Sequence, residues 1–291
     1  MNEILELLKT KYNLANILEQ PIVDSQNTVV GYHCYAQNKS GTTISGGTFK
    51  DKETALRIAV AELIERYFFQ ELCKTESAKQ YYIDEYPSTC GFAAGFDNKS
   101  TRFRAICEGL ERWAWSQWID YRFNLPLDAS EKKHTALTQT LGADFDQTFT
   151  YSKLFQINIS DTEALELKLV VFLGCKGDGI FAGSRVGSAG DELWEHAVVE
   201  ASRNYKNSLF YAKHPEKIDH KSTFAIRLLY FSKNKSEALK QISMATNIDW
   251  PTSELLVLKQ LDTGFDNIFI WRCLFKNYIG WHIGDEKTFV Y

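Results

Sequence analysis

Three stretches of the sequence share one short pattern of side chains that can do chemistry. They are AVAELIERYFF at 59–69, AICEGLERWAW at 105–115 and AVVEASRNYKN at 197–207, and each places a glutamate three residues after an alanine. A second glutamate follows after three more residues in the first two stretches, where the third stretch has an arginine. Residues three apart lie on one face of an α-helix, so the first two stretches each predict a pair of carboxylates that point the same way.

Carboxylates gathered in this way are suited to hold a divalent cation. Mg²⁺ prefers oxygen ligands and is usually held by a few carboxylates together with the phosphates of a nucleotide. Burying several carboxylates on such apolar helices is costly unless cations fill the space between them. We therefore predict one site for magnesium and a nucleotide, with these metal ligands: Glu62, Glu65, Glu108, Glu111 and Glu200.

A simpler explanation exists for the same glutamates. Glu62 with Arg66, and Glu108 with Arg112, are four residues apart, a spacing typical of ion pairs on the surface of helices. For one helix alone, that explanation would be favoured over a functional one. The repetition on three helices with apolar backgrounds favours a shared functional site instead.

A glycine-rich segment at 174–190 leads into the third stretch and is expected to form turns. Its Ser184 and Arg185 are candidates for phosphate contacts, although segments of this composition are usually turns without a ligand. The sequence contains neither a GxxxxGK[ST] phosphate loop nor a dinucleotide-binding fingerprint.

Composition narrows the class of protein. With 291 residues and 44% hydrophobic side chains, the chain is long enough for a well-buried core, and disorder is excluded. A net charge of −4, without a run of basic residues, argues against nucleic acid or a membrane surface as a partner. No segment reads as a signal peptide or a membrane span, which predicts a soluble, cytoplasmic protein. Six cysteines lie far apart, without metal-ligand spacing, and are expected to be reduced and mostly buried.

The order of predicted elements indicates an α+β fold, with mixed or antiparallel sheets and helices packed on them. Apolar periodicity predicts a first amphipathic helix, and the aromatic residues after the first two glutamate patterns are expected in the core. We expect a single domain, with a motif-bearing part at about 41–210 and a C-terminal αβ part at about 220–291. The expected helices and strands lie at 28–37, 42–46, 51–73, 100–121, 165–173, 191–209, 223–231, 235–245, 254–261, 267–275 and 278–282.

The three stretches, with their flanks, resemble the motifs of YcaO-like proteins from about Gly41 to Tyr205. The matching segments are SGGTFKDKETALRIAVAELIERY, GFAAGFDNKSTRFRAICEGLERWA and GSRVGSAGDELWEHAVVEASRNY. The resemblance implies that helix carboxylates bind ATP through Mg²⁺ and that ATP activates a peptide backbone amide by phosphorylation. An azoline, amidine or thioamide then forms, as in the biosynthesis of ribosomally made, modified peptides. The five glutamates would be the magnesium ligands, and Arg203 would contact phosphate.

The sequence departs from the family pattern at several points. Gly46-Gly47-Thr48 stands where many members have Gly-Lys-Gly, so Lys50 is the nearest lysine for a phosphate. Arg203 replaces the usual glutamine of the third motif. The chain ends in Lys-Thr-Phe-Val-Tyr, without the proline-rich tail of cyclodehydratases in this family.

Two functions from different classes follow. The first is an ATP- and Mg²⁺-dependent cyclodehydratase or thioamide-forming enzyme that acts on a peptide or protein presented by a partner protein. The second is a non-catalytic YcaO-like subunit that serves as a scaffold in a modification complex. An unrelated carboxylate-based metal hydrolase ranks third, and a homodimer is compatible with either of the first two. The sequence identifies neither the substrate peptide nor the nucleophile.

Overall fold

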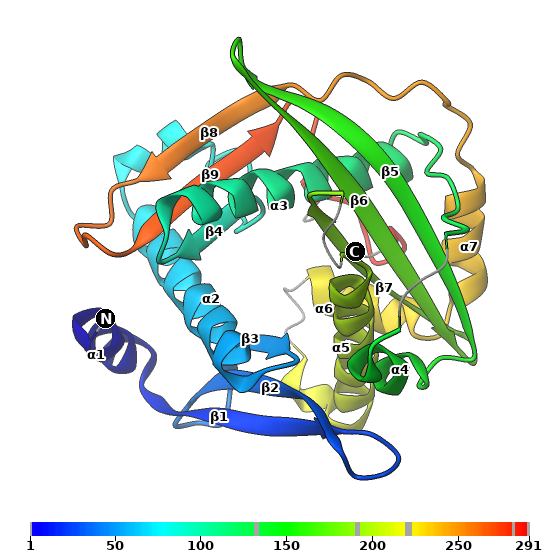
Figure 1. Ribbon diagram of the computed structural model, residues 1–291, viewed down its shortest axis with the longest axis horizontal. Helices are drawn as coiled ribbons and strands as arrows, with labels where there is room; N and C mark the ends of the chain where they lie inside the picture. Colours follow the sequence, from blue (N-terminus) through cyan, green and yellow to red (C-terminus); the bar gives the residue numbers. More distant parts are fainter. Residues whose placement is uncertain (1, 131–133, 190–192, 219–222, 281–282, 290–291) are drawn as a thin grey trace. The chain divides into compact units, whose positions relative to one another are not determined.

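The computed structural model describes residues 2–130, 134–189, 193–218, 223–280 and 283–289 (Figure 1). The chain forms two compact units. The first consists of Met1–Ile106 and Val257–Cys273, and the second of Cys107–Leu256 and Leu274–Tyr291. The expectation of a single domain therefore stays a prediction, and each unit is described by itself.

The first unit is built on two antiparallel sheets and a long helix. One sheet has the strand order β1-β2-β3, and the other has the order β4-β9-β8. Its elements are α1 (Asn2–Tyr12), β1 (Leu14–Val23), β2 (Val29–Asn38), β3 (Thr43–Phe49), α2 (Lys52–Leu72), the 3₁₀ helix η1 (Glu76–Tyr81), β4 (Phe92–Gly95), β8 (Leu255–Leu261) and β9 (Phe269–Phe275).

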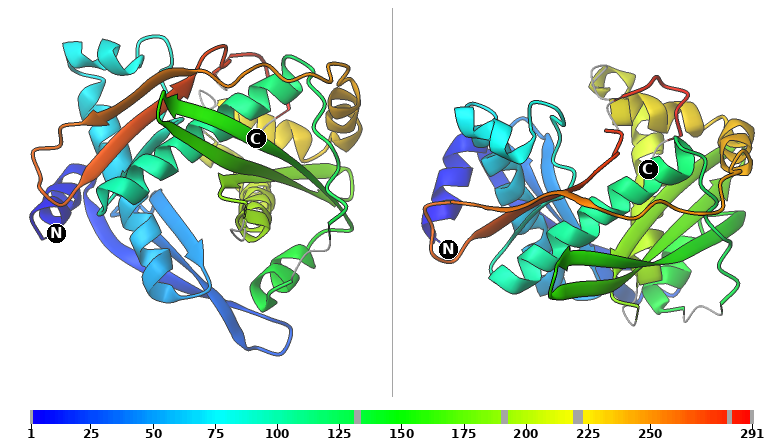
Figure 2. Two further views of the ribbon diagram at one scale, coloured as in Figure 1. Left: turned by 45° about the horizontal axis from the view of Figure 1, so that its top comes forward. Right: turned by 90° about the horizontal axis from the view of Figure 1, so that it is seen from above.

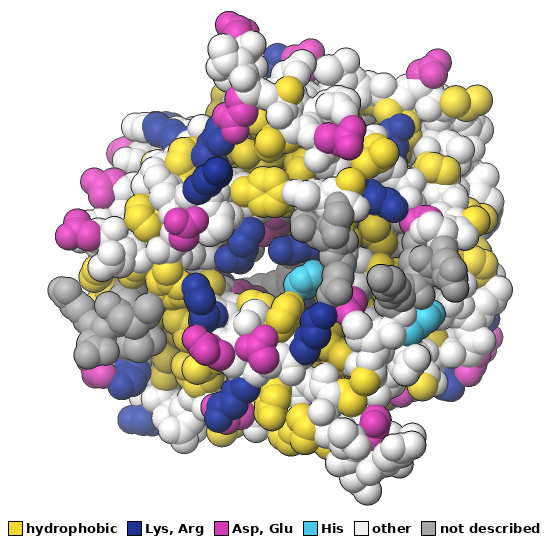
Figure 3. Space-filling view, viewed as in Figure 1, with side chains coloured by type: hydrophobic (Ala, Val, Ile, Leu, Met, Phe, Trp, Pro, Cys, Tyr) yellow, Lys and Arg dark blue, Asp and Glu magenta, His cyan; other side chains and the backbone are white. Residues whose placement is uncertain are grey.

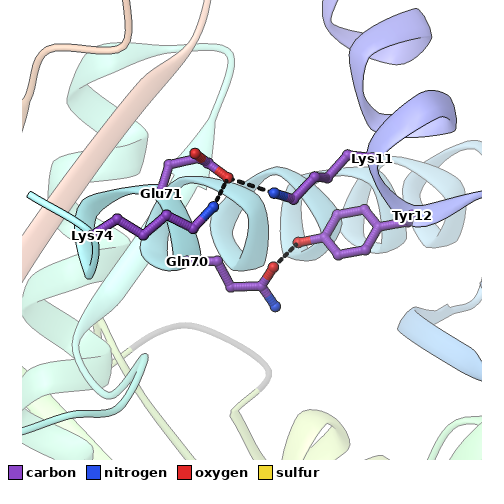
Figure 4. Close-up of polar contacts among 5 residues, drawn as sticks. All are labelled: Lys11, Tyr12, Gln70, Glu71 and Lys74. Atoms are coloured by element: carbon purple, nitrogen blue, oxygen red, sulfur yellow. Dashed lines mark hydrogen bonds and ion pairs between the residues drawn. The ribbon is translucent and has the colours of Figure 1, made fainter.

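Helix α2 begins where the sequence provides a strong cap. The Asp51 side chain accepts a hydrogen bond from the main-chain N–H of Thr54, which satisfies one of the donors left unpaired at a helix start. The apolar face of α2 then packs on β2 and β3. At its far end α2 is tied to α1, because Lys11 donates to Glu71 over 2.7 Å and the Tyr12 hydroxyl donates to Gln70 (Figure 4).

The second unit contains a three-stranded antiparallel sheet in the order β5-β6-β7, with helices packed on it. Strands β5 and β6 form a long hairpin that stands out in Figure 2. The elements are α4 (Ala136–Gly142), β5 (Gln147–Ser160), β6 (Glu163–Lys176), β7 (Gly179–Gly187), α5 (Leu193–Lys213), the 3₁₀ helix η2 (Pro215–Lys217), α6 (Thr223–Phe231) and α7 (Lys235–Ser243). Helix α3 (Asn98–Ile119) belongs to the first unit as far as Ile106 and to the second from Cys107.

The same arrangement of elements occurs once in each unit. A helix, three antiparallel strands and a second helix follow one another as α1-β1-β2-β3-α2 and again as α4-β5-β6-β7-α5. In both, the last strand approaches the last helix so closely that only glycine fits. A β-carbon at Gly47 would lie 2.2 Å from the carbonyl oxygen of Ala55, and one at Gly183 would lie 2.1 Å from that of Ala197.

The core of the second unit is aromatic. Trp113, Trp115 and Trp118 on α3 are almost fully buried. They pack against rings from β5 and the C-terminal segment, including Phe155 and Phe289. The prediction that the aromatic run after the second motif belongs to the core is confirmed. Of the six free cysteines only Cys73 is exposed, as expected for reduced and mostly buried thiols.

The predicted α+β class, with antiparallel sheets and packed helices, is confirmed. The expectation of turns at 174–190 was wrong, because β6 continues to Lys176 and β7 covers Gly179–Gly187. Nearly every residue of β7 is buried, so the strand lacks the polar and apolar alternation that would reveal it. Strands β1 and β5 were not predicted either. The element expected at 278–282 has no helix or strand at 278–280, and its last two residues lie outside the described part of the chain.

Two properties of the whole sequence can be checked on the structure. No helix in the described ranges is both long enough and apolar enough to cross a membrane. Figure 3 shows acidic and basic side chains interspersed over one face of the molecule, in keeping with the small net charge.

Candidate functional site

The second unit brings two of the predicted metal ligands to one strand. Glu111 lies on α3 and Glu200 on α5, and both accept hydrogen bonds from the main chain of β7. The N–H of Ser184 donates to Oε2 of Glu200 over 2.8 Å, and the N–H of Val186 donates to Oε2 of Glu111 over 3.2 Å. Since β7 is an edge strand, these carboxylates pair with amide groups that no neighbouring strand uses.

The electrostatics of this pair are unfavourable in the absence of a cation. Glu111 is only 5% exposed, and this burial raises the pKa of its carboxyl group. Arg112 and Arg185 lower that pKa, whereas the neighbouring Glu200 carboxylate raises it. The nearest contact with Arg112 is long, at 3.8 Å between Nη2 and Oε1 of Glu111. Two like charges held beside one strand therefore form a place where a cation would be stabilised.

The predicted phosphate contacts Ser184 and Arg185 lie beside this pair. The Ser184 hydroxyl accepts a hydrogen bond from Nε1 of Trp115 over 2.9 Å and is also hydrogen-bonded to the Glu111 carboxylate. It is buried, so its hydroxyl helps to position Glu111. Arg185 is half-buried and lies within electrostatic range of Glu111. A phosphate role stays a prediction for both residues.

The first unit holds its glutamate in the same way. The N–H of Gly46 on the edge strand β3 donates to Oε2 of Glu62 over 2.8 Å. In each unit the donor lies 16 residues before the glutamate, and the hydrogen bond has the same length. The two motifs are therefore alike in three dimensions as well as in sequence.

The two glutamates differ in what binds their other oxygen. Oε1 of Glu62 accepts from Arg66, over 2.5 Å from Nη2 and 3.2 Å from Nε, so the surface ion pair considered from the sequence does form. Asn204 stands one turn after Glu200 instead, and its Nδ2 donates to the main-chain carbonyl of Ala182. Oε1 of Glu200 has no partner among the described residues. The carboxylate of the second unit is thus open to a cation, whereas that of the first unit is closed by an arginine.

The remaining predicted residues are placed on the same elements. Glu65 lies half-buried on α2 within electrostatic range of Arg66, and Glu108 lies half-buried on α3 one turn before Glu111. Arg203 is exposed on α5, and Lys50 is exposed between β3 and α2. The convergence of all five glutamates on one site would join the two units and stays a prediction, as do the phosphate contacts of Arg203 and Lys50.

Neither unit contains a complete metal site of its own within the described residues. No three carboxylate, imidazole or thiol groups there are placed to hold a metal ion together. A pair such as Glu111 and Glu200 still suits Mg²⁺, because this ion commonly uses one or two carboxylates and takes its other ligands from phosphate and water.

Sequence reasoning missed the main-chain part of the site. The amide groups of Gly46, Ser184 and Val186 carry no side-chain signature, and β7 itself was not predicted. A usable signal was the shared distance of 16 residues that separates Glu62 and Glu200 from a small residue on a preceding strand.

Comparison with known proteins identifies the fold. No protein-family profile and no curated protein sequence matches this sequence. Solved structures do match. A chain of the E. coli microcin synthetase McbBCD complex aligns with a TM-score of 0.60 at 10% identity, over 94% of this chain and 92% of that one. YcaO from Methanopyrus kandleri, bound with AMPPCP and Mg²⁺, aligns with a TM-score of 0.59 at 10% identity, over 99% and 92%.

The chain has a YcaO fold. A heterocyclase in complex with substrate and cofactor also aligns, with a TM-score of 0.53 at 12% identity, over 94% of this chain and 52% of that one. Within the YcaO fold, the helices α2, α3 and α5 carry the motif glutamates, and the edge strands β3 and β7 donate main-chain hydrogen bonds to Glu62, Glu111 and Glu200. The sequence resemblance and the structural likeness therefore agree on the fold, although identity is low.

Proposed function

We propose that this protein binds ATP with Mg²⁺ and uses it to activate a backbone amide of a ribosomally made peptide or protein. The observation that carries the proposal is the pair Glu111 and Glu200, held side by side on the edge of β7 with one glutamate oxygen uncommitted. A magnesium ion held by these carboxylates would offset the burial and, to a smaller extent, the repulsion by Glu200 that raise the pKa of Glu111. ATP phosphates would complete its coordination.

The surrounding residues fit this role. Arg185 adds a positive charge beside the carboxylates, and the exposed Arg203 lies one turn after Glu200 on the same helix. Cations so placed suit the γ-phosphate, whose charge must be neutralised as it is transferred. The Ser184 hydroxyl and the Trp115 indole fix the geometry of the Glu111 side. The proposed cofactor agrees with the AMPPCP and Mg²⁺ bound by the Methanopyrus kandleri YcaO.

The reaction balances with ATP and one nucleophile. The amide oxygen receives the γ-phosphoryl group and ADP leaves, and a nucleophile then forms a bond to the amide carbon while phosphate departs with that oxygen. A cysteine thiol or a serine hydroxyl would give an azoline, an amine would give an amidine, and sulfide would give a thioamide. We propose a partner protein that presents the peptide, because the YcaO-fold neighbours include the multi-subunit McbBCD complex, also solved with pro-MccB17 bound.

One observation favours a second function, that of a non-catalytic subunit in a modification complex. The Arg66 guanidinium occupies the oxygen of Glu62 that a metal would need. In that case the glutamates would serve to protect the sheet edges and to hold the helices. The protein would then act by contact with an active homologue.

A titration of nucleotide binding tests the first part of the proposal. ATP binding to the full chain should require Mg²⁺, and Glu111→Gln should weaken it by at least about tenfold, because a charged ligand is lost. The matched control is Glu216→Gln, which removes the same charge from an exposed position on η2. Binding that is independent of Mg²⁺, or equal in both variants, would favour the scaffold function.

Phosphate release tests the second part. Turnover by the chain alone should be slow and should rise with candidate peptides and partner proteins, because remote binding energy positions the reacting amide. Peptide-dependent release that disappears in Glu111→Gln and persists in Glu216→Gln supports the enzyme. Rapid turnover without peptide would point to a simple nucleotide hydrolase, and the absence of acceleration with any partner would point to a scaffold.

A further inference from the structure

The second unit contains a pocket that the proposed function does not use. It has a volume of about 390 Å³, at the lower end of the range usual for small-molecule sites. Its walls come from the C-terminal end of α3, from α7 and from the C-terminal segment, all within the second unit. Neither Glu111 nor Glu200 lines it.

Gln241 on α7 lines the pocket and forms hydrogen bonds to its other walls. Its Nε2 donates to the main-chain oxygen of Lys287 over 2.6 Å, and its Oε1 accepts from the N–H of Phe289 over 3.0 Å. Its own main-chain oxygen accepts from the Arg122 guanidinium over 3.2 Å. One buried residue therefore joins the three walls, through its side chain and its main-chain oxygen.

Five charged side chains of both signs line this space: Asp120, Arg122, Glu237, Lys240 and Lys287. The side chains of Asp120, Glu237, Lys240 and Lys287 have no hydrogen bond or ion pair with any residue that the structure describes. Glu237 and Lys240 are three apart on α7 and still do not pair with each other. Opposite charges that line a concave space without pairing are suited to a ligand that carries both signs.

Asp120 marks the place for a cationic group. It follows directly after the end of α3, where the unpaired carbonyl groups of a helix give a partial negative charge. Burial raises the pKa of its carboxyl to about 6, although Arg227 and Arg122 act in the opposite direction. Arg227 is engaged elsewhere, since it donates to the main-chain oxygens of Asp285 and Ile283. A ligand ammonium would supply the partner that Asp120 lacks.

The other residues that line the pocket suit a carboxylate and an apolar side chain on the same ligand. Lys240, Lys287 and Arg122 give the pocket a net positive charge, which favours a carboxylate. Ile119 and Met244 add an apolar surface, and Met244 is exposed and able to adapt to different shapes. We propose that this pocket binds a free α-amino acid, with its ammonium on Asp120, its carboxylate on the lysine side and its side chain against Met244. The proposal is independent of the proposed ATP-dependent function.

Calorimetric titration of the full chain without nucleotide tests the proposal. The probes are L-leucine and L-methionine, each compared with its N-acetyl and its amide derivative. The free amino acids should bind with a dissociation constant below about 1 mM, and blocking either end should weaken binding by about tenfold or more. Failure of both free amino acids to bind at about 10 mM, or equal binding of the blocked forms, would overturn the proposal.

Two variants locate the site. Asp120→Asn keeps the shape of the side chain and should weaken binding of the free amino acid about tenfold. It should have little effect on the N-acetyl form, which lacks the ammonium. Lys240→Met should weaken the free acid more than the amide. The control is Lys206→Met on the exposed face of α5, which should bind like the parent. Unchanged affinity in both pocket variants would place the amino acid elsewhere and refute the assignment, whereas Mg·ATP binding should be the same in all four proteins.

Discussion

The substitution Glu111→Gln separates the charge of this buried side chain from its shape. Glutamine retains an oxygen that can accept from the N–H of Val186, so the hydrogen bond to β7 is kept. What disappears is the negative charge that burial and Glu200 both disfavour. Without nucleotide, the variant should therefore be as stable as the parent or more stable by about 1 kcal/mol.

Mg·ATP should reverse this order. A ligand present at about one hundred times its dissociation constant stabilises the folded state by about 2.7 kcal/mol. If the variant binds about one hundredfold more weakly, the same concentration stabilises it by only about 0.4 kcal/mol. For 291 residues, 1 kcal/mol corresponds to a shift in Tm of about 1.6 °C, so the parent should gain about 4 °C and the variant less than about 1 °C.

Thermal unfolding with and without Mg·ATP measures both quantities in one experiment. Glu216→Gln serves as the control, because its side chain is exposed and its loss of charge is the same. The control should melt like the parent in both conditions. Equal gains in Tm for Glu111→Gln and the parent would refute the reasoning, since the carboxylate would then contribute nothing to the nucleotide site. A metal-free variant that melts far below the parent would also refute it, by showing that the charge is needed for folding.

Three further predictions concern stability and can be measured by chemical or thermal denaturation. Arg66→Leu should change the free energy of unfolding by less than about 1 kcal/mol, because its ion pair with Glu62 is partly exposed to solvent. A loss of about 3 kcal/mol would mean that the glutamate depends on the arginine. Gly183→Ala should destabilise the folded state by about 3 kcal/mol, because the new β-carbon would lie 2.1 Å from a main-chain oxygen of α5. The control is Gly142→Ala, which has open space around it and should be neutral or stabilising. Asp120→Asn should stabilise the protein at pH 7 by about 1 kcal/mol, a value reduced for solvent screening of this half-buried group. The pKa of the Asp120 carboxyl is about 6 in the folded state and about 4 in the unfolded state. The parent should therefore lose stability as the pH rises from about 4 to about 6, and the variant should not. Parallel pH profiles of the two proteins would contradict the raised pKa of Asp120.

The helices and their glutamates were predictable because their signals are local. Helix α2 has a capping aspartate, a long apolar face and motif spacing, and its bounds agree with the sequence expectation to within a residue or two. The position of Glu111 and Glu200 beside one another was a reasonable expectation from the repetition of the motif. Their shared strand was not, because β7 is rich in glycine and buried, and its composition is that of a turn.

The different contacts of Glu62 in the first unit and Glu200 in the second could not be predicted from the sequence. Arg66 and Asn204 follow Glu62 and Glu200 at the same interval, and both side chains can form several alternative contacts. Only the packing decides that the arginine turns back to its glutamate while the asparagine binds the carbonyl of Ala182. Whether a motif carboxylate keeps an oxygen available for a cation therefore depends on tertiary structure, and a sequence motif does not predict it.

The way in which glutamates cover the edges of β3 and β7 has a consequence for self-association. An uncovered edge strand offers its N–H groups to a strand of another molecule and is a common origin of aggregation. Alanine in place of Glu62 would leave the N–H of Gly46 without its partner on the partly exposed strand β3, so the variant would tend to associate with other copies of the chain. Loss of activity in an alanine variant could then reflect a change in oligomeric state alone. A glutamine at the same position keeps the edge closed while it removes the charge, and the light-scattering profiles of the two variants should differ accordingly.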